Sequence, residues 1–75
     1  MSFELKTTME LVQIAAAGGG FRLDAAMRTT PELVQIAAAA SRTGARVTFA
    51  GLKFRTTPEL VQISAAGKGC VFLEG

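Results

Sequence analysis

Apolar side chains recur at helical spacing in three stretches of the chain, and the middle stretch shows the pattern best. Its apolar residues are placed at i, i+3, i+4 and i+7, the spacing of one buried helical stripe. The stripe consists of Leu33, Ile36, Ala37 and Ala40, widened by Val34 and Ala38. One glutamine in each stretch falls off the stripe and is predicted to face water: Gln13, Gln35 and Gln62. We therefore predict three Ala-rich amphipathic helices.

A pattern of period two follows each helical stretch. Residues 21–23, 46–49 and 70–73 are short β-prone runs in which apolar residues lie two apart. Because alternate side chains of a strand point to opposite faces, one face of each run is predicted to be buried. The residues predicted on that face are Phe21, Leu23, Val47, Phe49, Val71 and Leu73. Those predicted on the opposite face are Arg22, Thr48 and Phe72.

The helical stretches are copies of one motif. Arg-Thr-Thr-Pro-Glu-Leu-Val-Gln-Ile occupies residues 28–36 and 55–63 unchanged, and a near copy with Lys and Met occupies residues 6–14. The copies are offset by 22 and then 27 residues. Such periods are typical of repeat architectures, in which each unit buries its apolar face against a neighbour. The unequal offsets favour a natural duplication over a designed repeat.

Each copy begins with the signals of a helix start. Three Thr-x-x-Glu pairs have the spacing of a capping box: Thr7 with Glu10, Thr29 with Glu32, and Thr56 with Glu59. A proline at the first helical position would instead favour the second threonine, Thr30 or Thr57, as the cap, so the pattern leaves this choice open. Glycines are predicted to end the helices: Gly18–Gly20, Gly44, and Gly67 with Gly69.

These elements predict an α/β fold, a short right-handed βα repeat with three or four parallel strands and three helices on one face of the sheet. Residues 1–75 form one domain of three units, about 1–23, 24–49 and 50–75. A fourth strand at residues 3–5 is left open.

The composition narrows the class of protein. Hydrophobic residues make up 49% and charged residues 19% of the chain, which is typical of a globular domain. Cys70 is the single cysteine, so no internal disulfide forms, and there is no histidine to activate its thiol. No signal peptide or membrane-spanning run is evident. We expect a soluble, cytoplasmic protein that needs no cofactor or metal.

One unit resembles a leucine-rich repeat. It has that family's succession of strand, apolar turn and helix at Val47, Phe49, Leu52 and Phe54, then Leu60, Ile63 and Ala66. The chain contains no asparagine, so the asparagine ladder typical of the family is missing. The resemblance implies protein binding on the open face of the sheet. The residues carried over are Arg22, Asp24, Thr48, Phe72 and Glu74, with Ala50 as a further position.

Lys6, Arg28 and Arg55 precede the three helix starts and are predicted to form a basic ladder on one edge. Beside helix N-termini, such a ladder is a candidate anion site. The favoured alternative is that glutamates of the capping boxes stack nearby and neutralise it. The net charge of +2 is too small to indicate nucleic-acid binding by itself.

Other features favour no catalytic chemistry. The glycine clusters run from helix to strand, the reverse of a phosphate loop. Glu4, Asp24 and Glu74 are expected to form ion pairs with Arg22 rather than an acid–base site. Phe72 is either an exposed anchor for a partner or is covered by the N-terminus or a second copy. The last run is apolar on both faces, so a homodimer through this edge strand is a further expectation.

The leading hypothesis is a non-enzymatic protein-binding module, an inhibitor or adaptor that occludes a larger protein or complex. By size and type alone it resembles the small inhibitors of phages and mobile elements, such as anti-CRISPR proteins. The alternatives are a self-assembling structural repeat and, third, a weak nucleic-acid binder that uses the basic ladder.

Overall fold

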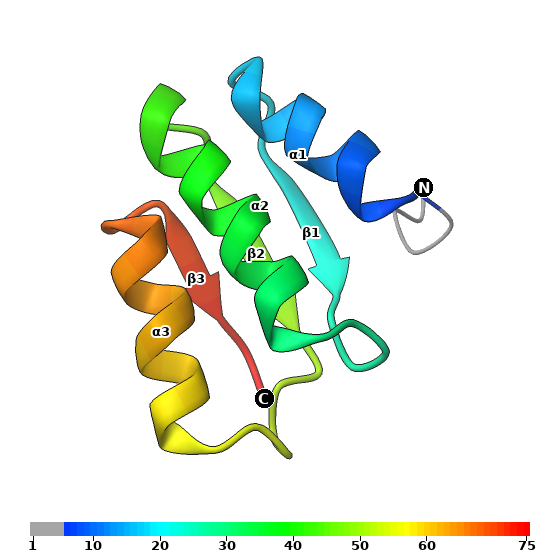
Figure 1. Cartoon of the computed structure of the whole chain (residues 1–75), viewed down its shortest axis with the longest axis vertical. Coiled ribbons are helices and arrows are strands. Elements are labelled where there is room, and N and C mark those ends of the chain that lie inside the picture. The colour runs from blue at the N-terminus through cyan, green and yellow to red at the C-terminus, as the bar shows by residue number, and fades with distance from the viewer. Residues whose placement is uncertain (1–5) are drawn as a thin grey trace.

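The computed structural model describes residues 6–75, in which helices and strands alternate along the chain (Figure 1). The elements are α1 (Thr8–Ala16), β1 (Phe21–Asp24), α2 (Thr30–Thr43), β2 (Val47–Ala50), α3 (Thr57–Gly67) and β3 (Val71–Leu73). Three helices and three strands were predicted at these places, and the strand bounds agree to within two residues.

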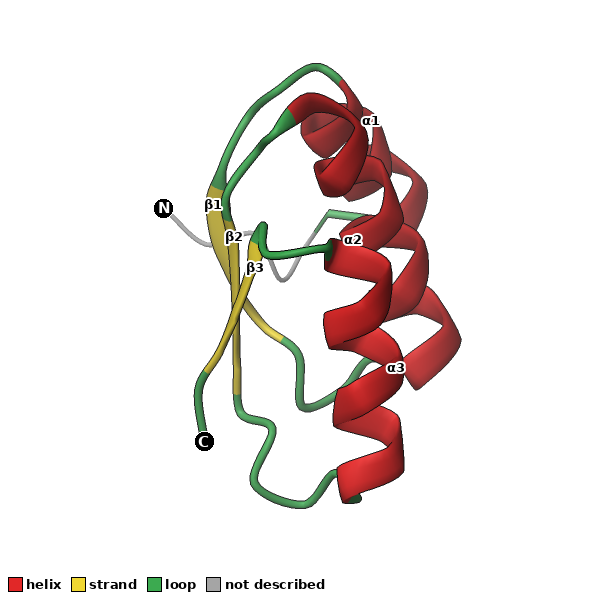
Figure 2. Ribbon diagram, turned by 90° about the vertical axis from the view of Figure 1, so that its left-hand side faces the viewer, coloured by secondary structure: helices red, strands yellow, loops and turns green. Residues whose placement is uncertain are grey.

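The strands form one parallel sheet in the order β1-β2-β3. Phe21 pairs with Val47, and Val47 with Val71, so equivalent residues of the three units lie in register across the sheet. All three helices pack on the same side of the sheet, and no helix of residues 6–75 lies on the other side, which we call the bare side (Figure 2). The predicted α/β class and parallel sheet are therefore confirmed. The fourth strand that the sequence left open, at residues 3–5, lies outside the described residues.

The core lies between the helices and the sheet. From the sheet, Phe21, Leu23, Val47 and Phe49 are buried, as the period-two pattern predicted. The helices contribute the predicted stripe, and its four middle-unit residues Leu33, Ile36, Ala37 and Ala40 are fully buried. The predicted outward glutamines are all exposed. At the last strand the prediction holds less well, because Val71 is half-buried and Leu73 is exposed at the outer edge of the described sheet.

The first threonine of each motif caps its helix. The hydroxyls of Thr7, Thr29 and Thr56 accept from the backbone N–H of the glutamate three residues on, and each glutamate accepts from the cap's backbone N–H at 2.8 Å. The three predicted capping boxes are confirmed. The argument from proline, which favoured Thr30 and Thr57, was wrong. Only the first threonine stands three residues before the glutamate, and proline fits equally well at the second helical position, where the backbone N–H is also without a helical partner.

The helix ends are only partly as predicted. Gly44 ends α2 with a φ of 76°, the left-handed conformation that glycine adopts without strain. Gly67, predicted as a stop, is instead the last residue of α3, and Lys68 takes the left-handed conformation with a φ of 49°. Gly67 serves a different purpose. A Cβ atom at this position would lie 2.5 Å from Cγ2 of Val71, so the glycine lets β3 approach the helix closely.

Candidate functional site

The bare side of the sheet carries the residues predicted to bind a partner. Arg22, Thr48 and Phe72 stand side by side in one row, because the register pairs Arg22 with Thr48 and Thr48 with Phe72. No helix of the described residues covers this side (Figure 2). Phe72 is 48% exposed, and Arg22 is also exposed. The sequence therefore placed this row on the correct face.

An ion pair on this face joins β1 to the residue that directly follows β3. Arg22 Nη2 lies 2.6 Å from Glu74 Oε1, as the sequence suggested for this pair. Both side chains are largely exposed, and ion pairs of this kind contribute little to folding. Asp24, also predicted to contribute here, is exposed and accepts a hydrogen bond of 3.0 Å from the backbone N–H of Ala26. The face thus presents an aromatic side chain beside charges of both signs.

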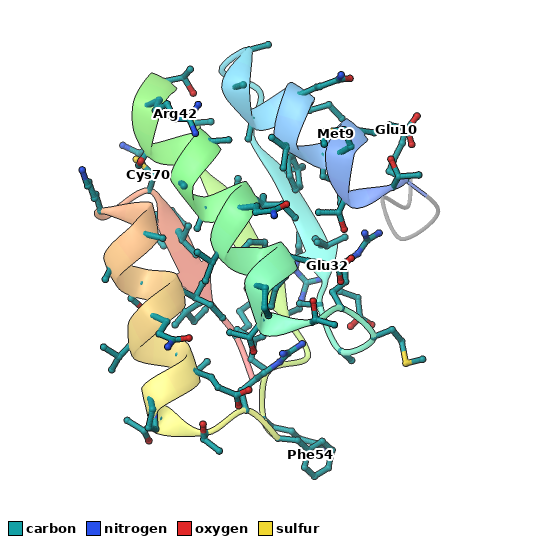
Figure 3. All side chains as sticks on the ribbon, in the orientation of Figure 1. Met9, Glu10, Glu32, Arg42, Phe54 and Cys70 are labelled. Atoms are coloured by element: carbon teal, nitrogen blue, oxygen red, sulfur yellow. The ribbon has the colours of Figure 1, made fainter. Side chains whose placement is uncertain are left out.

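A second exposed apolar set was not predicted, and one of its members, Phe54, had been counted among the apolar positions of the leucine-rich-repeat resemblance. Met27 and Phe54 are 96% and 90% exposed, in the loops that lead from β1 to α2 and from β2 to α3. Figure 3 shows Phe54 projecting away from its loop, and Lys53 Nζ lies 5.3 Å from the centre of its ring. Each of the two residues directly precedes the arginine of a motif copy. That shared position was the signal that could have identified them.

Two shallow hollows adjoin these loops. The first, about 310 Å³, is lined by Asp24, Met27, Arg28 and Glu32. The second, about 240 Å³, is lined by Leu52, Lys53, Arg55, Leu60, Leu73, Glu74 and Gly75. Both lie where the carboxyl ends of the strands face the starts of the helices, the place where open parallel sheets commonly bind ligands.

The predicted basic ladder exists as a row, but its arginines bind the protein itself. Arg28 donates to Thr8 Oγ1 at 3.0 Å and to the carbonyl of Lys6 at 2.6 Å. Arg55 makes the matching contact one unit later, to Thr30 Oγ1 at 2.7 Å, to the carbonyl of Ala25 at 2.9 Å and to the carbonyl of Arg28. Both guanidinium groups therefore join neighbouring units, which argues against the anion-site interpretation for them.

The capping glutamates complete this join. Glu32 Oε1 caps α2, while its Oε2 accepts from the Thr8 hydroxyl at 3.0 Å. Glu59 Oε2 accepts from Thr30 in the same way. We call this arrangement the clasp: the second threonine of one unit held between the arginine and the glutamate of the next. The predicted neutralisation of the arginines by these glutamates is thus largely indirect, through a shared hydroxyl group.

Hydrogen bonding lowers the pKa of the clasp carboxylates. The backbone N–H of Thr29 is the main cause for Glu32, followed by the hydroxyls of Thr8 and Thr29, and the charge of Arg28 adds a smaller effect. The pKa of Glu59 is lowered by the equivalent groups, first the backbone N–H of Thr56. The pKa of Glu10 is lowered by Thr7, with no contribution from a preceding unit. These shifts therefore follow mainly from the hydrogen bonds of the helix caps and, for Glu32 and Glu59, of the clasp.

Residues 6–75 contain no group of His, Cys, Asp and Glu side chains arranged to hold a metal ion, and they form no helix that is both long and apolar enough to cross a membrane. Cys70 is half-buried and forms no disulfide. Comparisons with protein-family models, with curated proteins and with solved structures gave no match for this chain.

Proposed function

We propose that this protein is a small non-enzymatic protein-binding module, an inhibitor or adaptor that acts by occluding part of a larger protein or complex. The observation that carries the proposal is the bare side of the sheet, on which Phe72 stands half-exposed in a row with Arg22 and Thr48. In contrast, the arginines of the alternative anion site are already engaged within the chain.

The chemistry of this face suits a protein partner. Aromatic side chains commonly provide much of the energy of protein–protein binding when a rim of polar groups surrounds them. Phe72 would be the aromatic anchor, and the exposed Arg22–Glu74 pair would form part of the rim. A module of this size would inhibit by covering a partner's surface, as expected for the phage-type inhibitors, including anti-CRISPR proteins, that it resembles in size.

We also propose that the three units form a short right-handed solenoid. The support is that equivalent residues lie in register across the sheet and that the same clasp joins the first unit to the second and the second to the third. Solenoids bury the flank of each unit against its neighbour and leave one broad face for binding.

The test is a tagged pull-down from nuclease-treated lysate of the source cells, read by mass spectrometry and repeated with two matched variants. Phe72→Glu places a charge on the bare side of the sheet, and Phe54→Glu makes the same chemical change on an exposed loop. We expect the wild type and Phe54→Glu to recover the same partner in fixed ratio, and Phe72→Glu to lose it.

Circular dichroism of both variants would establish that they remain folded. Loss of the partner only in Phe54→Glu would move the binding surface to the loops and overturn the assignment to the sheet. Recovery of no protein other than the bait's own copies would overturn the proposed function.

A further inference from the structure

Two clasps join the three units inside the chain. Each end of the described helix layer carries half of a further clasp, the threonine at one end and the glutamate with its cation at the other. At the end formed by α3, Thr57 occupies the position of Thr8 and Thr30, and it is exposed. Among residues 6–75, no arginine or glutamate forms a hydrogen bond with its hydroxyl. The hydroxyls of Thr8 and Thr30 each accept from an arginine and donate to a glutamate. The last unit thus presents a threonine in the place where a following unit would bind.

At the opposite end, α1 presents the other half of the clasp. Glu10 uses Oε1 to accept from the backbone of Thr7, and within the described chain no group donates to its Oε2. The equivalent Oε2 atoms of Glu32 and Glu59 both accept from a threonine of the preceding unit. Figure 3 shows Glu10 on the outer flank of α1, away from α2. Lys6, exposed beside it, stands in the place of Arg28 and Arg55.

The apolar contacts of the helix flank repeat the same asymmetry. Val12 and Val34 are partly buried and pack against the core, but Val61, the same motif position in α3, is 59% exposed. Leu60 is only partly buried, whereas Leu11 and Leu33 are fully buried. In the first two units, the following unit covers this flank of the helix. The same flank of α3 is exposed in the described chain.

We propose that a second copy of this chain occupies this flank, joined head to tail, with Thr57 of one copy entering a clasp formed by Lys6 and Glu10 of the next. The partner is specified by chemistry: it must offer a carboxylate and a cation at the start of a helix, with the spacing that the motif provides. Because the two surfaces differ, the contact is heterologous and each bound copy leaves a further flank available.

Two substitutions make this contact weaker than the internal ones. Lys6 offers a single nitrogen, where arginine presents a fork of donors to a threonine and to backbone carbonyls. Ser64 stands where the first two units have Ala15 and Ala37, which are fully buried, and it places a hydroxyl on the flank. We therefore expect association that rises with protein concentration rather than a permanent oligomer.

Sedimentation velocity over a range of concentrations tests the proposal with two single variants. Thr57→Val removes the hydroxyl at one end but keeps the cap, because Thr56 is the capping residue. Lys6→Glu reverses the charge at the other end and leaves the capping box of α1 intact. Each variant alone should self-associate about tenfold more weakly than the wild type, the effect of one charge-assisted hydrogen bond.

An equimolar mixture of the two variants is the decisive sample. Lys6→Glu retains the threonine end and Thr57→Val retains the clasp end, so the mixture should regain association, limited to pairs. Gln62→Ala is the matched control, since Gln13, Gln35 and Gln62 are exposed in all three units, and it should behave as the wild type. Lys6→Arg should strengthen association severalfold, because it restores the fork of donors.

Three outcomes would overturn the proposal. One is a wild type that stays monomeric up to about millimolar concentration, where a contact worth about 4 kcal/mol would be half formed. Another is association that both variants retain at full strength, which would indicate a symmetric dimer through the β3 edge instead. The third is a mixture that associates no better than its components. Circular dichroism of each variant would show that the comparison is between folded proteins.

Discussion

The second and third units contain the same nine residues but place them in different environments. Thr30 is 8% exposed and clasped, whereas its copy Thr57 is exposed. Leu33 is fully buried and its copy Leu60 only partly, while Ile36 and Ile63 are both fully buried. The isoleucine faces the core in both units, so it needs no following neighbour. The threonine and the leucine depend on the next unit, which α2 has and α3 lacks within the described chain.

The leucine pair should show the largest difference. Leu33→Ala would leave a cavity in the centre of the helix layer and cost about 3 kcal/mol, whereas Leu60→Ala would cost about 1 kcal/mol, because its side chain is already partly in water. A small domain has a small free energy of unfolding, so we expect Leu33→Ala to be substantially unfolded at 37 °C. Urea denaturation followed by circular dichroism measures both.

Equal losses of stability for Leu33→Ala and Leu60→Ala would contradict this prediction, because they would mean that α3 is covered as completely as α2. Ile36→Val and Ile63→Val serve as controls. Both isoleucines are fully buried, so the two substitutions should cost similar amounts, about 1 kcal/mol each.

The threonine pair should show a smaller difference. Thr30→Val preserves the shape of the side chain but removes the hydroxyl that Arg55 and Glu59 share, at a cost of about 1–2 kcal/mol. Thr57→Val should change the free energy of unfolding by less than about 0.5 kcal/mol, as is usual for an exposed position. The measurement is urea denaturation at low micromolar concentration, where self-association makes no contribution. A similar cost at both positions would show that the clasp adds nothing to stability.

The smallest expected effect is on the dependence of stability on pH. The pKa values of Glu10, Glu32 and Glu59 lie below the usual value of 4.5 in the folded protein. A carboxylate with a lowered pKa contributes stability above its unfolded pKa, and that stability is lost as the pH falls through the folded pKa. The loss should therefore begin near pH 4.5 and continue below it.

Glutamine variants distinguish the pH dependence contributed by a glutamate inside a clasp from that contributed by Glu10, which has no clasp within the described chain. Glu32→Gln should flatten the acid limb of the stability curve more than Glu10→Gln, because Glu32 also accepts from a threonine of the preceding unit. Thermal unfolding between about pH 2 and pH 6 measures both variants against the wild type. Identical acid limbs for the two would mean that the bond from Thr8 does not favour the charged form of Glu32.

Much of the fold could be predicted because the sequence patterns that specify its helices and strands involve only neighbouring residues. The stripe from Leu33 to Ala40, the alternation through Phe21 and Leu23, and the Thr-x-x-Glu spacing each report on a few neighbouring residues. Helix ends were harder. Gly67 was predicted as a stop, but it is needed for close packing against Val71, a contact that depends on how the chain returns after α3.

The candidate site was predicted only in part. The period of two placed Arg22, Thr48 and Phe72 on a common face, but whether any helix covers that face depends on how the three units pack. The exposure of Met27 and Phe54 was not predicted, because Met27 belongs to no pattern and Phe54 was counted among the apolar positions of the leucine-rich-repeat resemblance. The arginines that follow them, Arg28 and Arg55, instead bind backbone carbonyls of the preceding unit.

The sequence alone determined the alternation of helix and strand, the caps and the inward faces, because these depend on interactions within one turn or one strand. Only the tertiary structure decided which hydrogen-bond partners the second threonine, the arginine and the glutamate of each motif find in the neighbouring unit. Their partners lie 20 to 29 residues away in the chain, and the sequence does not state which atom meets which across that distance. Identical residues can therefore be a buried clasp in one unit and a free end in the next.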